Sequence, residues 1–324
     1  MILTVIEHDG DKIESVSLEM LTVARGLAEA VGGSLGAVLV GGEARPLADH
    51  LPAYGVSTVH LVEHERLRDY APEAWARSVA QLAERLSPEA IVGPGTDRGN
   101  EVLAHLGAVT WQPMAANCTE VRPGDNGYEV TRVRWGGSLL EEARLSGAPK
   151  LLTVAPHVVE AEQAATAPDL AVETFAPELD DKAFRVQVTE RVETAEDKIS
   201  LAEARIVIGG GRGVGSEEGF EVLEELADLL GGAVGGSRVV TNLGWRPHAD
   251  QIGQTGTRIA PDLYIACGIS GAIQHMVGCK GAKQILAINS DREAPIMSKA
   301  DYAVVADLHE VLPALVDEVK KAQS

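Results

Sequence analysis

The sequence predicts an α/β protein built from two domains. Apolar runs of strand length alternate with amphipathic helical segments in both halves, and a charged stretch over 160–200 separates them. Aromatic residues make up only 4% while the chain holds 34 Gly, so we expect cores of Val, Leu, Ile and Ala and many tight strand-to-helix turns. At about 150 residues per domain, 324 residues suit two domains, which we place at 1–190 and 191–324.

Composition narrows the classes of partner. The chain carries 28 Lys and Arg against 48 Asp and Glu, a formal net charge of -20 that repels the phosphate backbone of nucleic acids. Cys118, Cys267 and Cys279 form no Cys-x-x-Cys pair, which argues against a disulfide framework or a thiolate zinc site. We therefore expect a protein of a reducing cytoplasm, with no nucleic acid among its partners.

No segment predicts a membrane anchor or a targeting leader. The first residues lack a basic leader and a small-residue cleavage site. The uncharged run 263–279 is just too short for a bilayer and is interrupted by Gly and Gln. We expect a chain that does not span a membrane.

In the first half, the β-branched and aliphatic runs predict strands and the amphipathic segments predict helices. The expected strands are 3–7, 35–40, 58–62, 90–92, 116–121, 128–135 and 151–154, and the expected helices are 18–31, 72–86 and 100–106. These elements alternate as β-α units, which favours a sheet covered by helices.

Over 160–200 acids outnumber bases and no long apolar face is present, although 184–188 could form one short strand. The β-α pattern then resumes. Its expected strands are 205–208, 263–267, 284–289 and 302–305, and its expected helices are 217–230, one beginning at Ser270, and a last helix with Asp307 as N-cap. We expect a compact parallel sheet with helices on both faces.

The run 209–216, Gly-Gly-Gly-Arg-Gly-Val-Gly-Ser, joins a strand to a helix. Such a turn lets the backbone approach a phosphate, and Arg212 could bind an anion in a bidentate manner. The spacing departs from the dinucleotide fingerprint because Val214 stands where the third Gly belongs. A tight turn with no ligand is the alternative interpretation.

Further polar clusters lie on glycine-flanked bends. Ser237 and Arg238 follow Gly235-Gly236, Gln254 and Thr255 lie within Gly-Gln-Thr-Gly, and 268–275 follows the strand 263–267. Ser270 would cap a helix whose second turn holds Gln274 and His275, and two more strands end near Asn289 and Asp307. Solvated loops and a core histidine are the structural alternatives. Polar groups at several strand ends predict a nucleotide-sized ligand at one edge of the sheet.

One apparent metal motif is excluded by its context. His60-Leu61-Val62-Glu63-His64 has the His-x-x-Glu-His spacing of one metalloprotease class, which requires both imidazoles on one helical face. The residues continue a β-branched run, so their side chains alternate between faces. We predict no metal site there.

The motifs of the second half, taken together, resemble the FAD domain of the electron transfer flavoprotein alpha subunit. The match runs in order over about 205–320. The first half matches more loosely, through its β-α pattern and Trp135-Gly136-Gly137. The segments that carry the resemblance are Gly-Gly-Arg-Gly at 210–213, Gly-Gly-Ser-Arg at 235–238, Gly-Gln-Thr-Gly at 253–256, Ala-Pro-Asp-Leu-Tyr-Ile-Ala at 260–266, Gly-Ile-Ser-Gly-Ala-Ile-Gln-His at 268–275, Ala-Ile-Asn at 287–289 and Ala-Asp-Tyr at 300–302.

The resemblance implies one FAD held mainly by a Rossmann-like C-terminal domain, and an N-terminal domain that serves as scaffold and partner interface. It implies that Thr255 bonds near flavin N5, that His275 lies by the C2 carbonyl, and that Arg238 and His275 stabilise the charge of a singly reduced flavin. It implies neither a catalytic nucleophile nor a metal. The implied cofactor-binding residues are Arg212, Ser237, Arg238, Ile252, Gly253, Gln254, Thr255, Ser270, Gly271, Ala272, Ile273, Gln274, His275, Asn289, Asp307 and Leu308.

The resemblance further implies an electron carrier that pairs with a beta subunit and is not a self-sufficient enzyme. Its donors would be soluble flavoprotein dehydrogenases of acyl-CoA type, and its acceptor a membrane quinone reductase or a similar protein. One alternative is a subunit of an NADH-dependent electron-bifurcating flavoprotein complex. Another is a nicotinamide-nucleotide binding module, against which the incomplete glycine fingerprint argues.

Overall fold

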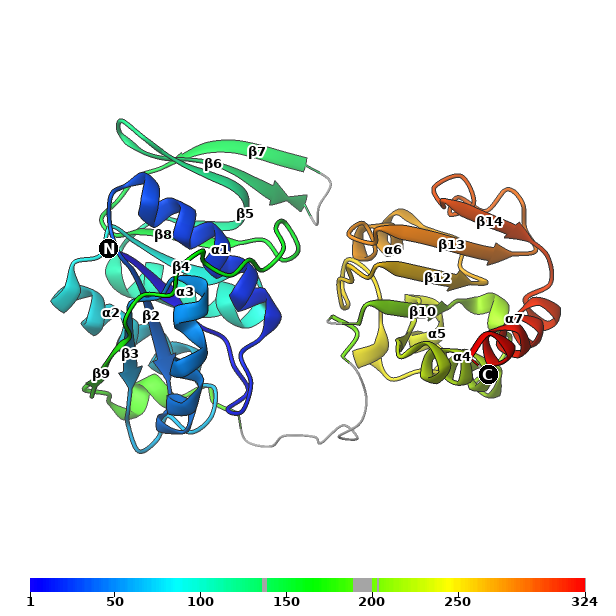
Figure 1. Ribbon diagram of the computed structural model, residues 1–324, viewed down its shortest axis with the longest axis horizontal. Helices are drawn as coiled ribbons and strands as arrows, with labels where there is room; N and C mark the ends of the chain where they lie inside the picture. The colour runs from blue at the N-terminus through cyan, green and yellow to red at the C-terminus, as the bar shows by residue number, and fades with distance from the viewer. Residues whose placement is uncertain (136–138, 189–199, 203, 324) are drawn as a thin grey trace. The chain divides into compact units, whose positions relative to one another are not determined.

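The computed structural model describes residues 1–135, 139–188, 200–202 and 204–323. The chain divides into two compact units, Met1–Val192 and Glu193–Ser324 (Figure 1). The expected motif residues Gly136 and Gly137 lie outside the described part of the chain.

The first unit is built on a sheet whose nine described strands run in the order β7-β6-β5-β8-β4-β1-β2-β3-β9. In this order, every pair of neighbours between β5 and the edge strand β9 is parallel. The two remaining pairs, β5-β6 and β6-β7, are antiparallel. The strands are β1 (Ile2–Val5), β2 (Leu35–Val40), β3 (Thr58–Val62), β4 (Ala90–Pro94), β5 (Met114–Gly124), β6 (Gly127–Arg134), β7 (Leu139–Leu145), β8 (Lys150–Val154) and β9 (Ala171–Phe175).

Alternation along the strands supplies two cores in this unit. In β1, Ile2 packs with α1 (Ser15–Ala30) on one face, and Leu3 packs with α2 (Pro72–Leu86) and α3 (Asp97–Thr110) on the other. Strands β2 and β3 follow on one side of β1 and β4 on the other, so the strand order reverses between β1 and β4. Open α/β sheets leave a crevice at the carboxyl ends of their strands at such a point.

The second unit has a fully parallel sheet in the order β11-β10-β12-β13-β14. Its order reverses between β10 and β12. Its strands are β10 (Ile206–Gly210), β11 (Ala233–Gly236), β12 (Leu263–Cys267), β13 (Gln284–Asn289) and β14 (Tyr302–Val305), and its helices are α4 (Glu221–Leu230), α5 (Arg238–Asn242), α6 (Ile273–Gly278) and α7 (Leu308–Gln323).

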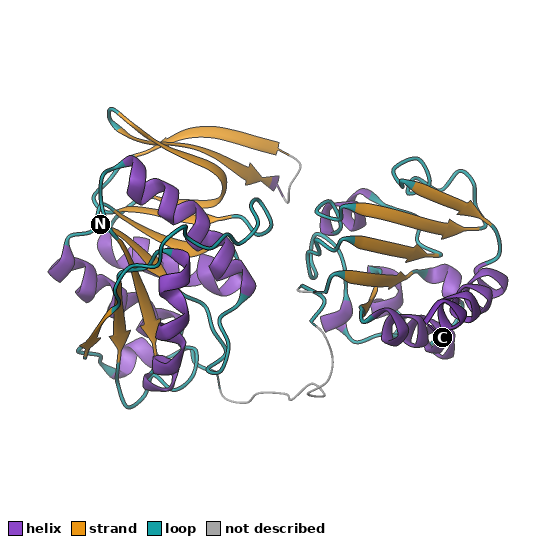
Figure 2. Cartoon of the chain, viewed as in Figure 1, coloured by secondary structure: helices purple, strands orange, loops and turns teal. Residues whose placement is uncertain are grey.

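The two faces of this second sheet are covered unequally (Figure 2). On one face, α4 and α7 supply the buried side chains Leu223, Leu226, Leu312 and Val316. On the other, irregular segments supply most of the apolar cover, together with the six-residue α6. The expectation of helices on both faces therefore holds fully for one face, while loops do most of the covering on the other.

The predicted α/β class with two sheets is confirmed. The strand predicted at 184–188 is wrong: Phe184 ends the 3-10 helix η3 (Asp181–Phe184) and its ring stacks on His64. Strands β7, β9 and β11 were not predicted. His60 lies on β3 and His64 beyond its end, which confirms that the two histidines share no helical face.

Candidate functional site

A pocket of about 640 Å³ opens in the second unit beside the ends of β10 and β12. It is lined by twelve of the sixteen site residues predicted from the sequence. They are Arg212, Ser237, Arg238, Ile252, Gly253, Gln254, Thr255, Ser270, Ala272, Gln274, His275 and Asn289. The structure therefore brings together residues spread over 78 positions of sequence.

Glycines bring the turns after β10 and β12 into direct contact. Gly211 N donates to Cys267 O at 2.8 Å, and Gly213 N donates to Gly268 O at 3.1 Å. A Cβ on Gly211 would overlap the Gly268 carbonyl, and Gly268 itself has φ +63°. Only glycine allows this approach, which holds the two turns against each other at the part of the pocket that Gly213 and Gly268 line.

The first two glycines of the predicted phosphate turn have a different role. Gly209 and Gly210 belong to β10, and a Cβ on either would overlap a buried aromatic ring, Tyr264 and Phe220 respectively. Their lack of side chains therefore serves core packing, and the part of the motif that lines the pocket begins at Arg212.

Positive charge in the pocket comes from Arg212 and Arg238. Both side chains are exposed, and neither pairs with a carboxylate in the described part of the chain. Asp291 is the single acid among the lining residues. Two guanidinium groups free to form bidentate bonds favour an anionic ligand group.

The loop that carries Thr255 is held by a buried amide. Gln251 Nε2 donates to Thr255 Oγ1 at 3.0 Å, and Thr241 Oγ1 donates to Gln251 Oε1 at 3.0 Å. Gln254 N donates to Gln274 O at 2.8 Å and ties this loop to the start of α6. Gln251 was not predicted, yet it lines the pocket and positions Thr255.

His275 lies in the first turn of α6, whereas the second turn was predicted. Ser270 is not the cap of this helix, because Ala272 occupies the N-cap position and the segment before it is extended around the pocket. His275 Nε2 lies 2.8 Å from the Tyr264 hydroxyl, and Nδ1 has no hydrogen-bond partner among the described residues.

Burial lowers the pKa of His275 to about 4, although the Ile252 carbonyl acts in the opposite direction. The imidazole is therefore neutral near pH 7. A neutral imidazole can supply a hydrogen bond but no charge, so the positive charge of the pocket lies on the arginines. That Arg238 and His275 stabilise a singly reduced flavin stays a prediction.

Four predicted residues do not line the pocket. Gly271 packs against Ile296, Ile273 is largely exposed, and Leu308, the first residue of α7, is buried in the core. Asp307 accepts a hydrogen bond from His309 N at 2.9 Å and caps α7 as predicted. Their contact with a ligand stays a prediction.

Eight lining residues were absent from the predicted set. Gly213, Gly268 and Ile269 lie inside the recognised motifs, and Val239 and Asn242 belong to α5, a helix that the periodicity did not predict. The others are Gln251, Asp291 and Ala294.

Comparison with known proteins identifies this pocket. Residues 200–280 match the family model described as the electron transfer flavoprotein FAD-binding domain, and residues 2–180 match the electron transfer flavoprotein domain. The chain belongs to the electron transfer flavoprotein alpha-subunit family.

Curated relatives match over nearly the whole chain. The electron transfer flavoprotein subunit alpha of Thermoanaerobacterium thermosaccharolyticum is 36% identical over 97% of this chain and 96% of its own length. Protein FixB of Clostridium saccharobutylicum is 37% identical, covering 97% and 95%. The subunit alpha of Mycobacterium tuberculosis is 40% identical, covering 98% of each.

FAD is the cofactor of this family's domain, and the pocket fits it. Its volume lies within the range of about 300–1,000 Å³ usual for ligand sites. Two unpaired arginines suit a diphosphate, and Gly213 and Gly268 line the pocket without side chains. His275 Nδ1 is a buried polar atom with no side-chain partner in the described part of the chain.

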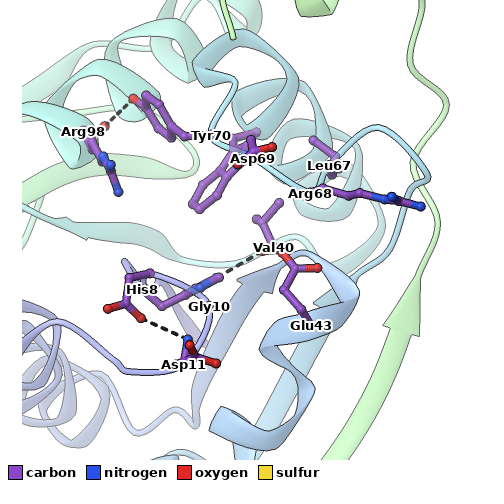
Figure 3. Close-up of a pocket in the computed structure, with 12 residues that line it drawn as sticks. His8, Gly10, Asp11, Val40, Glu43, Leu67, Arg68, Asp69, Tyr70 and Arg98 are labelled. Atoms are coloured by element: carbon purple, nitrogen blue, oxygen red, sulfur yellow. Dashed lines mark hydrogen bonds between the residues drawn. The ribbon is translucent and has the colours of Figure 1, made fainter. Parts of the chain in front are cut away.

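The first unit has a second, smaller pocket of about 350 Å³ at its own reversal of strand order (Figure 3). His8 follows β1, and its Nε2 atom lies 3.0 Å from Val40 O. The lining includes two arginines, Arg68 and Arg98, against four acids: Asp9, Asp11, Glu43 and Asp69. Its charge balance is therefore opposite to that of the FAD pocket.

Other classes of site find little support. Within the described ranges, no group of three or more His, Cys, Asp or Glu could hold a metal ion. In the same part of the chain, no helix combines the length and the apolar character needed to cross a bilayer.

Proposed function

We propose that this chain pairs with a beta subunit and carries electrons between protein partners in the cytoplasm. Its donors would be soluble flavoprotein dehydrogenases of acyl-CoA type, and its acceptor a membrane quinone reductase or a similar protein. Membership of the alpha-subunit family supports electron transfer as the general role. The observation that carries the proposal is the pocket at the β10/β12 reversal, with its contacting glycine turns and two unpaired arginines.

The chain's own residues would bind and shield the cofactor. FAD, when bound, supplies the redox chemistry by accepting and releasing single electrons. Arg212 and Arg238 would hold anionic groups, the glycine turns would admit the diphosphate, and Thr255 would bond to a polar edge of the ring. Ile252 and Ala272 would exclude water from the ring faces.

The proposal is tested by producing the chain together with its beta subunit and recording the visible spectrum. We expect a yellow complex with bound FAD that is reduced by an acyl-CoA dehydrogenase and its substrate. A colourless complex that takes up no added FAD would contradict the proposal.

Flavin stoichiometry distinguishes the bifurcating alternative. A simple carrier should hold one FAD per heterodimer and should not oxidise NADH. Two flavins per heterodimer together with NADH oxidation would instead assign the chain to an electron-bifurcating complex. Cell fractionation tests the cytoplasmic location, which a membrane or exported fraction would overturn.

A further inference from the structure

Beneath the FAD pocket, a buried tyrosine contacts the imidazole that lines it. Tyr264 lies on β12 with no exposed surface, and its hydroxyl is 2.8 Å from His275 Nε2. The two ring centroids lie 6.1 Å apart with an interplanar angle of 31°. Gly209 on the neighbouring β10 leaves the space for this hydroxyl, since a Cβ there would overlap it.

The direction of this hydrogen bond follows from the surroundings of the hydroxyl. Burial holds the pKa of Tyr264 well above its usual value, so the phenol keeps its proton. His275 Nε2 is the one hydrogen-bond partner of the hydroxyl within the described part of the chain. If Nε2 donated, the phenol proton would be buried without an acceptor, which is costly, whereas a proton on the other ring nitrogen has the Ile252 carbonyl available as an acceptor. The hydroxyl therefore donates, and Nε2 accepts.

We infer that Tyr264 is a positioning residue of the FAD site, which holds His275 as the tautomer with its proton on Nδ1. A neutral imidazole carries one proton, so acceptance at Nε2 places that proton on Nδ1. His275 lines the pocket, and apart from the Ile252 carbonyl, which acts on the pKa of the ring, Nδ1 has no partner among the residues described. His275 thus keeps a donor at Nδ1 for an acceptor atom of the cofactor, in competition with the Ile252 carbonyl. This last step rests on the proposed function, whereas the tautomer does not.

The test combines the tautomer with cofactor affinity. Nitrogen-15 NMR of histidine-labelled complex, with FAD bound and after its removal, distinguishes a protonated from a bare ring nitrogen. The signals of His275 among the nine histidines are identified by their loss in His275→Gln. We expect a protonated Nδ1 and a bare Nε2 in the wild-type protein.

Tyr264→Phe removes the hydroxyl and retains the ring. We expect the proton to redistribute toward Nε2 and FAD binding to weaken about fivefold, the effect of about one hydrogen bond. Tyr128→Phe is the matched control. It removes another buried hydroxyl, in the first unit, which has no hydrogen-bond partner within the described ranges. It should change neither reading.

Three results would overturn the inference: a proton on Nε2 in the wild-type protein, an unchanged tautomer in Tyr264→Phe, or an unchanged FAD affinity despite a changed tautomer. The wild-type spectrum decides the direction of donation even if the variant fails to fold. If the wild-type complex bound no FAD, the proposed function would fall, while the FAD-free spectrum would still decide the role of Tyr264.

Discussion

The two units place a pocket at the same topological position and line it with opposite chemistry. Each sheet reverses its strand order beside a central strand, β1 in the first unit and β10 in the second, and each pocket lies at the carboxyl ends there. The second pocket holds two unpaired arginines and one acid. The first holds two arginines and four acids and has about half the volume.

This difference shows that the sheet supplies the crevice and the loops select the ligand. In the second unit, glycines at the ends of β10 and β12 let the turns touch. In the first unit, the turn after β1 runs through His8 and Asp9. The carboxylate of Asp9 accepts hydrogen bonds from Asp11 N and Lys12 N. A pocket with this excess of acids opposes a diphosphate. We therefore expect FAD in the second unit alone.

The largest effect is expected where the glycine turns meet. Gly211→Ala places a Cβ onto the Gly268 carbonyl, a backbone atom that cannot move aside cheaply. We expect a loss of about 3 kcal/mol in the free energy of unfolding, as for overpacked cores, and loss of bound FAD. Urea unfolding and the flavin content of the purified complex measure both.

Gly26→Ala in α1 is the control in the other unit. Gly26 has no atom near the position of the added Cβ, and Ala is a better helix former by about 1 kcal/mol. This variant should be as stable as the wild-type protein or more stable, with unchanged FAD content. Equal behaviour of the two variants would show that contact between the turns does not shape the site.

Much of the fold could be predicted because hydrophobic periodicity determines the buried elements. Helix α2 and strands β2, β3, β12, β13 and β14 have the predicted bounds. The elements that were missed lack such a signal. Strands β7 and β9 are mostly exposed, and β11 reads Ala-Val-Gly-Gly, which resembles a turn. Their pairing partners decide their structure, and a single sequence does not show those partners.

The next largest expected effect is the pH dependence of stability that each unit's buried histidine causes. Burial lowers the pKa of His275 to about 4, so below about pH 6.5 the unfolded chain binds a proton that the folded one does not. The free energy of unfolding should therefore fall by about 3 kcal/mol between about pH 6.5 and 4. Urea unfolding of the FAD-free chain across this range measures it, and His275→Gln should flatten the curve.

His8 gives the comparison in the first unit. Burial lowers its pKa also, but the hydrogen bond with the Val40 carbonyl acts in the opposite direction, and so do the charges of Glu43 and Asp9. His8→Gln should therefore change the pH dependence in the same sense and by less. A larger effect from His8→Gln than from His275→Gln would contradict this assignment of charges to the two pockets.

A smaller effect is expected from removing one cation from each pocket. Arg238→Ala should weaken FAD binding about tenfold, or about 1.4 kcal/mol, because it removes an exposed, partly screened anion contact. Arg98→Ala in the first unit should leave FAD affinity unchanged. Fluorescence titration with FAD measures both. Equal losses would mean that the acidic pocket also takes part in FAD binding.

The residues of the site could be predicted where they belong to contiguous sequence motifs. They could not be predicted where their role depends on a side-chain contact that only the folded chain forms. Twelve of the predicted residues line the pocket. They follow the strands β10, β11 and β12, end β13, or belong to the loop 252–255 and the start of α6. The sequence does not show that Gln251 reaches Thr255, or that Tyr264, inside an apolar strand, has its hydroxyl against His275. A tyrosine in such a strand is expected to pack in a core, and its hydrogen-bond partner depends on the position of α6.

The smallest effect is expected from the single acid of the FAD pocket. Asp291→Asn removes a negative charge beside the anion-binding arginines and keeps a side-chain oxygen that can accept from Glu293 N, as Asp291 does at 2.9 Å. Since the side chain is exposed and solvent screens it, FAD should bind only about two- to threefold more tightly. Titration at low and high salt measures this, and the gain in affinity should shrink as salt rises.

Glu43→Gln, the matching change in the first unit, should leave the affinity for FAD unchanged. A gain from Glu43→Gln as large as that from Asp291→Asn would show that the net charge of the chain, and not the composition of one pocket, governs affinity for the cofactor.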